Sequence, residues 1–332
     1  MNTRNLLSLP LSMAALLAVT SCAASTGEAA SAGSGPESPT VLASFYPLQY
    51  VAEKVGGDMV QVGSLTPPGA EPHDLELSPN AVAELEGADL VVYLSGFQPA
   101  VDEAVERTSA ERVVDAAAAA GIGATNDGEG AASEDAHAGH DRAAEASAAA
   151  EEDAHAGHNH GTADPHFWLD PARLADVAHE VAHGLGAADP ENADAYEANA
   201  VALTEELTAL DEEFKNGLAQ CERKTIVVSH EAYGFLADKY GLEQVGIAGL
   251  EPETEPSPAR LAEIGEVVKA EGVTTVFSES LVNPKVSQTL ADDLGIEAAV
   301  LDPAEAQADA GKDYQQVMRE NLAALQKALG CK

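Results

Sequence analysis

The sequence predicts an α/β protein in which two lobes, each a small parallel sheet flanked by helices, are joined by one long helix. Three observations predict this class. Short β-branched runs alternate with helical patterns in the first half of the chain, the same alternation recurs in the second half, and one long apolar stripe of helical period separates them. Alternation of this kind is typical of parallel sheets, whose strands are connected through covering helices.

Residues 40–188 are assigned to the N-terminal lobe. Four runs in it have the composition of strands, the last more weakly than the others: 41–45, 60–65, 89–94 and 112–115. Helical spacing is found at residues 48–55 and 78–85.

Residues 221–332 repeat the scheme and are assigned to the C-terminal lobe. Strands are expected at 225–229, 244–247, 274–278 and 297–301. Helices are expected at 233–240, 258–271, 284–294 and 314–329.

Residues 189–220 are predicted to form the helix that joins the lobes. Asp189 suits its N-cap and Pro190 suits its first turn. Seven apolar residues then recur at spacings of three and four: Tyr196, Ala200, Leu203, Leu207, Leu210, Phe214 and Leu218. One stripe of this length predicts a helix of about 30 residues, roughly 45 Å long, which would couple the lobes stiffly.

The first 22 residues have the features of an export signal. Arg4 precedes an apolar stretch at residues 6–19 that is too short to span a bilayer. The stretch ends in small residues and Cys22, which is similar to a bacterial lipobox; an ordinary signal peptide cut near Ala23 or Ala24 is the alternative. Residues 23–39 fit a flexible tether. We therefore expect a protein secreted across the cytoplasmic membrane and lipid-anchored through Cys22 to its outer face, on the cell surface or in the periplasm.

Two cysteines remain besides Cys22. In an exported protein Cys221 and Cys331 are a plausible disulfide, although the sequence alone leaves two free thiols open. The bond would join the start of the C-terminal lobe to the last helix. Closing a loop of that size would stabilise the fold by up to about 4 to 5 kcal/mol in the chain-entropy model.

The chain is strongly acidic, with 56 acidic and 17 basic residues and a formal net charge of −39. Such a surface repels nucleic acid, so we expect no nucleic-acid partner. Diffuse negative charge attracts cations without selecting one metal, so metal selectivity requires a defined site.

Residues 121–164 interrupt the alternation of strands and helices. They are rich in Ala, Gly, Glu, Asp and His without an apolar period, which predicts a disordered or mobile loop. The heptapeptide EDAHAGH occurs in it twice, at 134–140 and 152–158. A solvated tract is the simpler interpretation, and a low-affinity zinc-collecting arm is the hypothesis for five of its histidines: His137, His140, His155, His158 and His160.

Three histidines outside this loop have distinctive settings. His73 and His230 follow predicted strands, His166 lies in the segment DPHFWLDP, and the carboxylate of Asp302 follows the last predicted strand. Ligand sites gather at the carboxyl ends of parallel strands, and neighbouring prolines restrict these loops. Three imidazoles and one carboxylate suit four-coordinate Zn²⁺, whose affinity should fall as the pH drops through about 6.5.

These segments resemble the metal-binding subfamily of ABC-transporter solute-binding proteins, the zinc and manganese uptake lipoproteins. The matching pieces are EPHD at 71–74, DPHFWLDP at 164–171, SHEAY at 229–233, FSES at 277–280 and LDP at 301–303. The resemblance implies one metal ligand from each of the first three pieces and a variable fourth. We assign the fourth ligand to Asp302, with Glu71 as a rival and Glu279 as a further candidate that is expected to be structural.

The resemblance implies a monomer that captures Zn²⁺ in a cleft between the lobes and delivers it to an ABC permease and its ATPase. Manganese members of the family have a glutamate where this chain has His230, and the softer imidazole favours zinc over Mn²⁺. A manganese-binding member, a zinc buffer and an adhesin are the alternatives. A filled four-ligand shell leaves no position for a substrate, so no enzyme is expected.

A rival motif is present at His179, Glu180 and His183, which form the H-E-x-x-H signature of zinc peptidases. The spacing puts both histidines on one helical face. No third histidine follows at the metzincin position, and the resemblance places this helix on the outside, so we expect the histidines to face solvent. A peptidase is therefore the less favoured hypothesis.

Overall fold

The computed structural model describes residues 38–109, 112–122 and 164–332, and two four-stranded parallel sheets lie within this part of the chain. The first has the order β2-β1-β3-β4, and the second has the equivalent order β6-β5-β7-β8. The strands are β1 (Thr40–Ala43), β2 (Gln61–Ser64), β3 (Leu90–Tyr93), β4 (Val113–Asp115), β5 (Thr225–Val228), β6 (Glu243–Gly246), β7 (Thr275–Ser278) and β8 (Glu297–Val300). The predicted fold class is confirmed.

The first sheet is covered on both faces, as the alternation of its side chains requires. Leu42 and Val91 pack with α2 (Pro79–Gly87) and α3 (Pro99–Val105) on one face. Val41 and Val92 point to the other face, where α1 (Tyr46–Gly56) and α5 (Pro171–Ala188) pack. A short helix, α4 (Ala116–Ala119), follows β4 directly and contacts α5.

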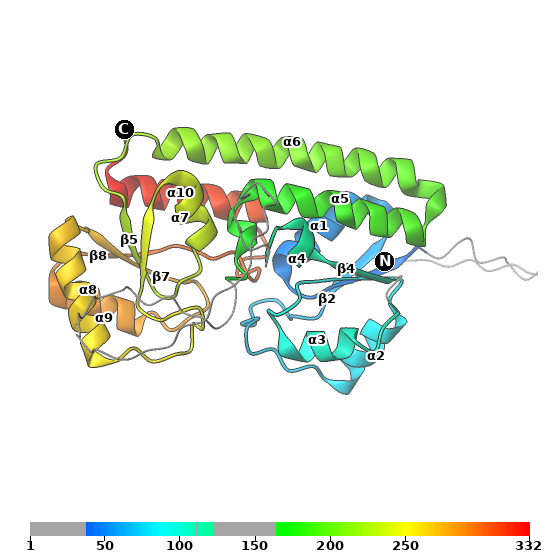
Figure 1. Cartoon of the computed structure of the whole chain (residues 1–332), viewed down its shortest axis with the longest axis horizontal. Helices are drawn as coiled ribbons and strands as arrows, with labels where there is room; N and C mark the ends of the chain where they lie inside the picture. The colour runs from blue at the N-terminus through cyan, green and yellow to red at the C-terminus, as the bar shows by residue number, and fades with distance from the viewer. Residues whose placement is uncertain (1–37, 110–111, 123–163) are drawn as a thin grey trace, which may run out of the picture. The chain divides into compact units, whose positions relative to one another are not determined.

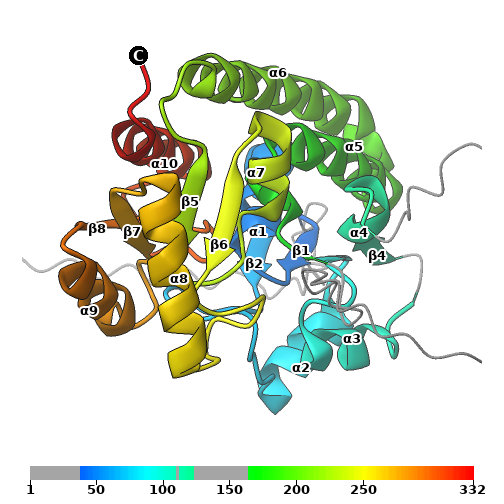
Figure 2. The ribbon, with the colours of Figure 1, turned by 60° about the vertical axis from the view of Figure 1, so that its left-hand side comes forward.

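The second sheet is covered in the same way. Val227 and Val276 pack with α8 (Pro258–Glu271) and α9 (Lys285–Leu294), which lie on one face of it (Figure 2). Ile226 and Phe277 belong to the core on the opposite face, together with residues of α7 (Gly234–Tyr240) and α10 (Tyr314–Leu329). Asp313 and Gln316 form a capping box at the start of α10, which begins and ends where the sequence predicts.

The long helix α6 (Ala193–Leu218) lies beside α5 in both views (Figures 1 and 2). A 3₁₀ turn, η4 (Pro190–Asn192), separates the two helices, so α6 begins three residues after the predicted start. Asp189 accepts hydrogen bonds from the Asn192 side chain and the Tyr196 hydroxyl at this corner. All seven residues of the predicted apolar stripe are buried, and α6 also contacts α1 and α10. It therefore connects the two lobes along its length.

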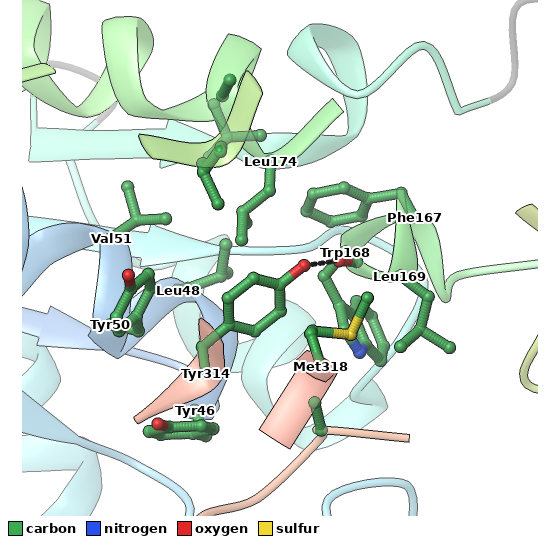
Figure 3. Close-up of a cluster of buried hydrophobic side chains, with 14 of the residues drawn as sticks. Tyr46, Leu48, Tyr50, Val51, Phe167, Trp168, Leu169, Leu174, Tyr314 and Met318 are labelled. Atoms are coloured by element: carbon green, nitrogen blue, oxygen red, sulfur yellow. Dashed lines mark hydrogen bonds between the residues drawn. The ribbon is translucent and has the colours of Figure 1, made fainter. Parts of the chain in front are cut away.

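One continuous core crosses from lobe to lobe. Tyr314 of α10 points toward the turn η3 (Phe167–Leu169), and its hydroxyl donates a hydrogen bond to the carbonyl of Trp168 (Figure 3). Its ring lies 5.3 Å from that of Tyr50 in α1, whose hydroxyl accepts a hydrogen bond from the Gln315 amide at 2.9 Å. Packing of this kind favours stiff coupling between the lobes.

The structure contains a disulfide between Cys221 and Cys331, which confirms the pairing that the sequence allows. None of the described helices combines the length and apolar character needed to cross a bilayer. The predicted lipidation site at Cys22, nearly all of the tether, and the five loop histidines lie outside the described residues: His137, His140, His155, His158 and His160.

Candidate metal centre

Three buried histidines from distant parts of the chain converge at the carboxyl ends of the two sheets. His73 lies in the loop after β2, His166 immediately precedes η3, and His230 lies two residues beyond β5. His166 and His230 are fully buried, and His73 is 7% exposed. The ring centroids are 5.2 to 5.7 Å apart.

Local interactions hold each of these loops in place. The backbone N–H of His73 donates to the carboxylate of Glu71, and its ring packs edge-on against Phe97 at 4.8 Å. The indole of Trp168 lies 5.2 Å from the ring of His166 and is fully buried beneath it. Rigid support of this kind is what a metal site requires, because its ligands must be placed to within fractions of an ångström.

A fourth side chain, Glu305, completes the cluster. Its carboxylate oxygens lie 3.1 Å from His166 Nε2, 3.4 Å from His230 Nε2 and 3.4 Å from His73 Nε2. The Nε2 atoms of His166 and His230 are 3.3 Å apart, and the four candidate ligand atoms all lie within 4.8 Å of one another. A tetrahedral zinc shell with bonds of about 2.0 to 2.1 Å has ligand–ligand edges of about 3.3 to 3.4 Å. The spacings among His166 Nε2, His230 Nε2 and one Glu305 oxygen, 3.1 to 3.4 Å, therefore match the edges of such a shell.

Two atoms of this cluster lack a hydrogen-bond partner in the described part of the chain. They are His73 Nε2 and Glu305 Oε1, and both are buried. A buried polar atom without a partner costs free energy, so native proteins rarely retain one without a reason. A cation at the centre of the cluster would satisfy both atoms at once.

Carboxylates orient two of the three imidazoles from behind. His166 Nδ1 lies 2.7 Å from Asp164 Oδ1, and His230 Nδ1 lies 2.6 Å from Glu279 Oε1, which also accepts a hydrogen bond from the Ser229 hydroxyl. A carboxylate at Nδ1 fixes the tautomer in which Nδ1 carries the proton, leaving the Nε2 lone pair for a metal.

The electrostatics of the cluster favour positive charge at its centre. Burial alone would lower the pKa of His230, but the adjacent carboxylates of Glu279 and Glu305 raise that pKa to about 10. Burial likewise opposes protonation of His166, whose pKa is nevertheless raised by Asp164 and Glu305. Burial would raise the pKa of Glu305, yet the three histidines hold it well below its usual range. The surrounding carboxylates thus favour positive charge on the imidazoles, and a metal cation bound there would take the place of protons.

Comparison with known families identifies the kind of protein that has this arrangement. A family model for ZnuA, described as "Zinc-uptake complex component A periplasmic", matches residues 41–328. The chain belongs to the ZnuA family. The match extends across both lobes and includes all four clustered side chains.

Individual relatives of this ZnuA-family chain are similar along most of its length. It is 32% identical over 292 residues to the zinc-binding lipoprotein AdcA of Streptococcus pneumoniae, a match that covers 86% of this chain and 55% of the relative. The chain thus spans about half the length of such relatives. It is also 33% identical over 321 residues to the high-affinity zinc uptake system protein ZnuA of Bacillus subtilis, covering 95% of each chain.

Solved structures of family members have the same fold. The Zn(II)-bound ZnuA-like domain of Streptococcus pneumoniae AdcA is 30% identical, with a TM-score of 0.67 and coverage of 88% of this chain and 98% of that one. The laminin-binding protein Lmb of Streptococcus agalactiae, described as having adhesin and metal-transporting activity, is also 30% identical. Its TM-score is 0.71, with coverage of 88% of this chain and all of the other.

In this ZnuA-family structure the carboxylate grouped with the histidines is Glu305, whereas the sequence assigned the fourth position to Asp302. Asp302 accepts a hydrogen bond from the Ser280 hydroxyl at 2.6 Å and another from the N–H of Ala304 at 2.8 Å. The second bond closes a turn in which Ala304 adopts the left-handed conformation, with a φ of 55°. Trp168 donates to the carbonyl of Pro303 at 2.8 Å. The turn directs Glu305 toward the histidines.

A signal for Glu305 was present in the sequence. An aspartate followed by proline commonly caps its own turn through its side chain, and these hydrogen bonds fix the direction of its carboxylate. That consideration moves the fourth-ligand candidate three residues along, to the next acidic side chain. The rival candidate Glu71 lies at the edge of the cluster, 4.0 Å from His73 Nε2, and burial raises its pKa. Glu279 lies behind His230, at Nδ1.

The H-E-x-x-H histidines are not part of this cluster. His179 contacts α6, where its Nδ1 lies 3.3 Å from Glu197 and its Nε2 lies 3.2 Å from the Thr204 hydroxyl. His183 is exposed, as expected, whereas His179 is partly buried, contrary to the expectation that both face solvent. Within the described residues, the one group of side chains that could hold a metal ion is that of His73, His166, His230 and Glu305.

Proposed function

We propose that this protein is an extracytoplasmic solute-binding protein that captures one Zn²⁺ with His73, His166, His230 and Glu305. The observation that carries the proposal is the convergence of three buried imidazoles and one buried carboxylate. Their ligand atoms all lie within 4.8 Å of one another, and those of His166, His230 and Glu305 have spacings of 3.1 to 3.4 Å that suit a tetrahedral shell. Zinc is supported by the relatives of this chain, which include a Zn(II)-bound domain and a high-affinity zinc uptake system protein.

Zinc is favoured over Mn²⁺ by the chemistry of the donors. Three imidazoles are softer than the carboxylates that manganese prefers, and His230 supplies the third of them. The four protein ligands complete a tetrahedral shell and leave no position for a reacting water, so the proposed role is binding without catalysis.

The captured ion is proposed to be cargo for an ABC permease and its ATPase. Cys22 would anchor the protein to the membrane as a lipoprotein, with residues 23–39 as the tether. The proposed lobes, residues 40–188 and 221–332, would present the site between them, with residues 189–220 as the stiff connection. Stiff coupling favours release by local loop shifts over wide hinge closure.

Metal analysis and competitive titration with a zinc chelator test the binding proposal. The protein without residues 1–22 is expected to hold one tightly bound zinc. The His230→Ala variant should lose more than the 10- to 100-fold in affinity that is typical for removal of an outer hydrogen-bond partner, because a ligand itself is removed. A wild-type protein without a tight zinc site, or a His230→Ala variant that binds zinc as tightly as the wild type, would contradict the proposal.

A further inference from the structure

Among the described residues of the N-terminal lobe, no carboxylate lies within 4.0 Å of Nδ1 of the third imidazole, that of His73. His166 and His230 each face a carboxylate at Nδ1, 2.7 and 2.6 Å away. Metal-binding histidines almost always donate this second N–H to a carboxylate, a carbonyl or water. Among the described residues, the carboxylate within 4.0 Å of His73 Nδ1 is that of Glu251, at 3.8 Å. Glu251 belongs to the opposite lobe.

The segment that carries Glu251 is fixed beside His230. It follows β6, and it is attached by hydrogen bonds from the N–H of Glu231 to the carbonyl of Gly249 at 2.9 Å and from Ala248 to Ser229 at 2.8 Å. Thr254 donates to the carbonyl of Glu251 at 3.3 Å, closing a turn with proline at its second position. Such a turn is rigid, so Glu251 is presented from a defined place on the lobe that holds His230.

The two partners differ sharply in exposure. The His73 side chain is 4% exposed and that of Glu251 is 64% exposed. The 3.8 Å separation is about 1 Å longer than a charge-assisted hydrogen bond, and the Glu251 side chain, being exposed, has the freedom to change rotamer. Glu71 does not compete for this position, because its carboxylate contacts the backbone N–H and the Nε2 side of His73.

We propose that Glu251 is a positioning residue that reaches across from the C-terminal lobe to orient His73 and thereby slows the release of zinc. The inference rests on the proposed function. His166 and His230 are oriented by carboxylates close to them in the structure, whereas the orientation of His73 depends on how the segment after β6 sits against it. A small displacement of that segment would free the His73 ring, so this ligand is the first to dissociate.

Zinc release from the full chain, loaded with one equivalent of zinc and mixed with excess chromogenic chelator, tests the proposal. Glu251→Ala should release zinc about tenfold faster than the wild type. Removing a hydrogen-bond partner of a metal ligand typically costs about 10- to 100-fold in metal affinity, and the lower end is expected here because the Glu251 side chain is exposed. Glu251→Gln should be intermediate, because the amide oxygen still accepts from Nδ1–H. Glu253→Ala and Glu255→Ala remove the same charge from exposed positions of the same segment and should match the wild type.

Two further measurements distinguish a positioning role of Glu251 from a general loss of stability. The unfolding temperature of the metal-free protein should not change in Glu251→Ala, and ¹⁵N NMR of the zinc-loaded protein should show a shift of one imidazole, that of His73. Wild-type release rates in Glu251→Ala, or equal acceleration in Glu253→Ala, would overturn the inference while leaving the zinc site intact. Absence of a tight zinc in the wild type would instead overturn the proposed function, and this inference with it.

Discussion

Glu305 and Asp302 lie three residues apart in one turn, yet their carboxylates have different surroundings. Glu305 faces three imidazoles, whereas both oxygens of Asp302 accept hydrogen bonds, from Ser280 and from Ala304. Glu305→Gln should therefore lower zinc affinity by more than 100-fold, because it removes an anionic ligand.

The matched variant Asp302→Asn keeps an oxygen for the N–H of Ala304 and can still bond to Ser280. We expect it to lose less than about tenfold in zinc affinity, since the turn is preserved. Competitive titration of both variants measures the difference. Equal losses would mean that Asp302 also contacts the ion.

The pKa of His230 determines how zinc binding responds to pH. Glu279 and Glu305 raise this pKa to about 10 against the opposing effect of burial, so the metal-free imidazole is protonated at neutral pH. Zinc requires the neutral ring and must displace this proton, so the apparent affinity should fall about tenfold per pH unit for each displaced proton below pH 10. An ordinary imidazole would cause this fall only below about pH 6.5.

Chelator titrations between pH 6.5 and 9 distinguish the two cases, and proton release on zinc addition can be counted in the same range. Affinity that does not change between pH 7 and 9 would show that no proton is displaced from the site there. His166 should likewise lower the apparent zinc affinity as the pH falls, because its pKa is also raised.

At the scale of elements, we expect the ligand cluster to bind zinc without the His-rich segment. All four clustered side chains lie outside residues 126–163. Deleting this segment should leave one tight zinc per protein, with an affinity close to that of the full chain. Metal analysis and titration measure this, with the same deletion combined with His230→Ala as the control. Loss of the tight zinc on deletion alone would place a ligand within the segment.

The sequence predicted the ends of a helix correctly where a clear capping pattern marks them. Helices α8 and α10 begin and end at the predicted residues, because proline follows a serine cap in α8 and a capping box opens α10. Helices α3 and α4, which have seven and four residues, were not predicted.

The start of α6 was misplaced for a different reason. Pro190 suits a first helical turn, but here it opens a 3₁₀ turn at a corner that Asp189 closes through Asn192 and Tyr196. Choosing between Glu305 and Asp302 required the same knowledge. The start of α6 and the identity of the fourth carboxylate both depend on which local side-chain hydrogen bond forms. The spacing of residues in the sequence does not determine which bond that is.

At the scale of the whole molecule, the metal site and the disulfide lie at opposite ends of one strand. Cys221 precedes β5 and His230 follows it, while Cys331 lies just beyond α10. Backbone hydrogen bonds already hold the two chain segments together beside the disulfide, since the N–H groups of Glu222 and Arg223 both donate to the carbonyl of Leu329. The bond should therefore constrain the unfolded chain more than the shape of the site.

Replacing both cysteines by serine should lower the free energy of unfolding by about 2 to 5 kcal/mol, because the bond closes a loop that spans 110 residues. Zinc affinity should be unchanged, because the four clustered side chains and their carboxylate partners lie beyond the other ends of the strands. Denaturant unfolding of the metal-free variant measures the first effect and chelator titration the second. A marked loss of zinc affinity would show that the two ends of β5 are coupled, and that the stiffness of the joined lobes transmits strain from the disulfide to the histidines.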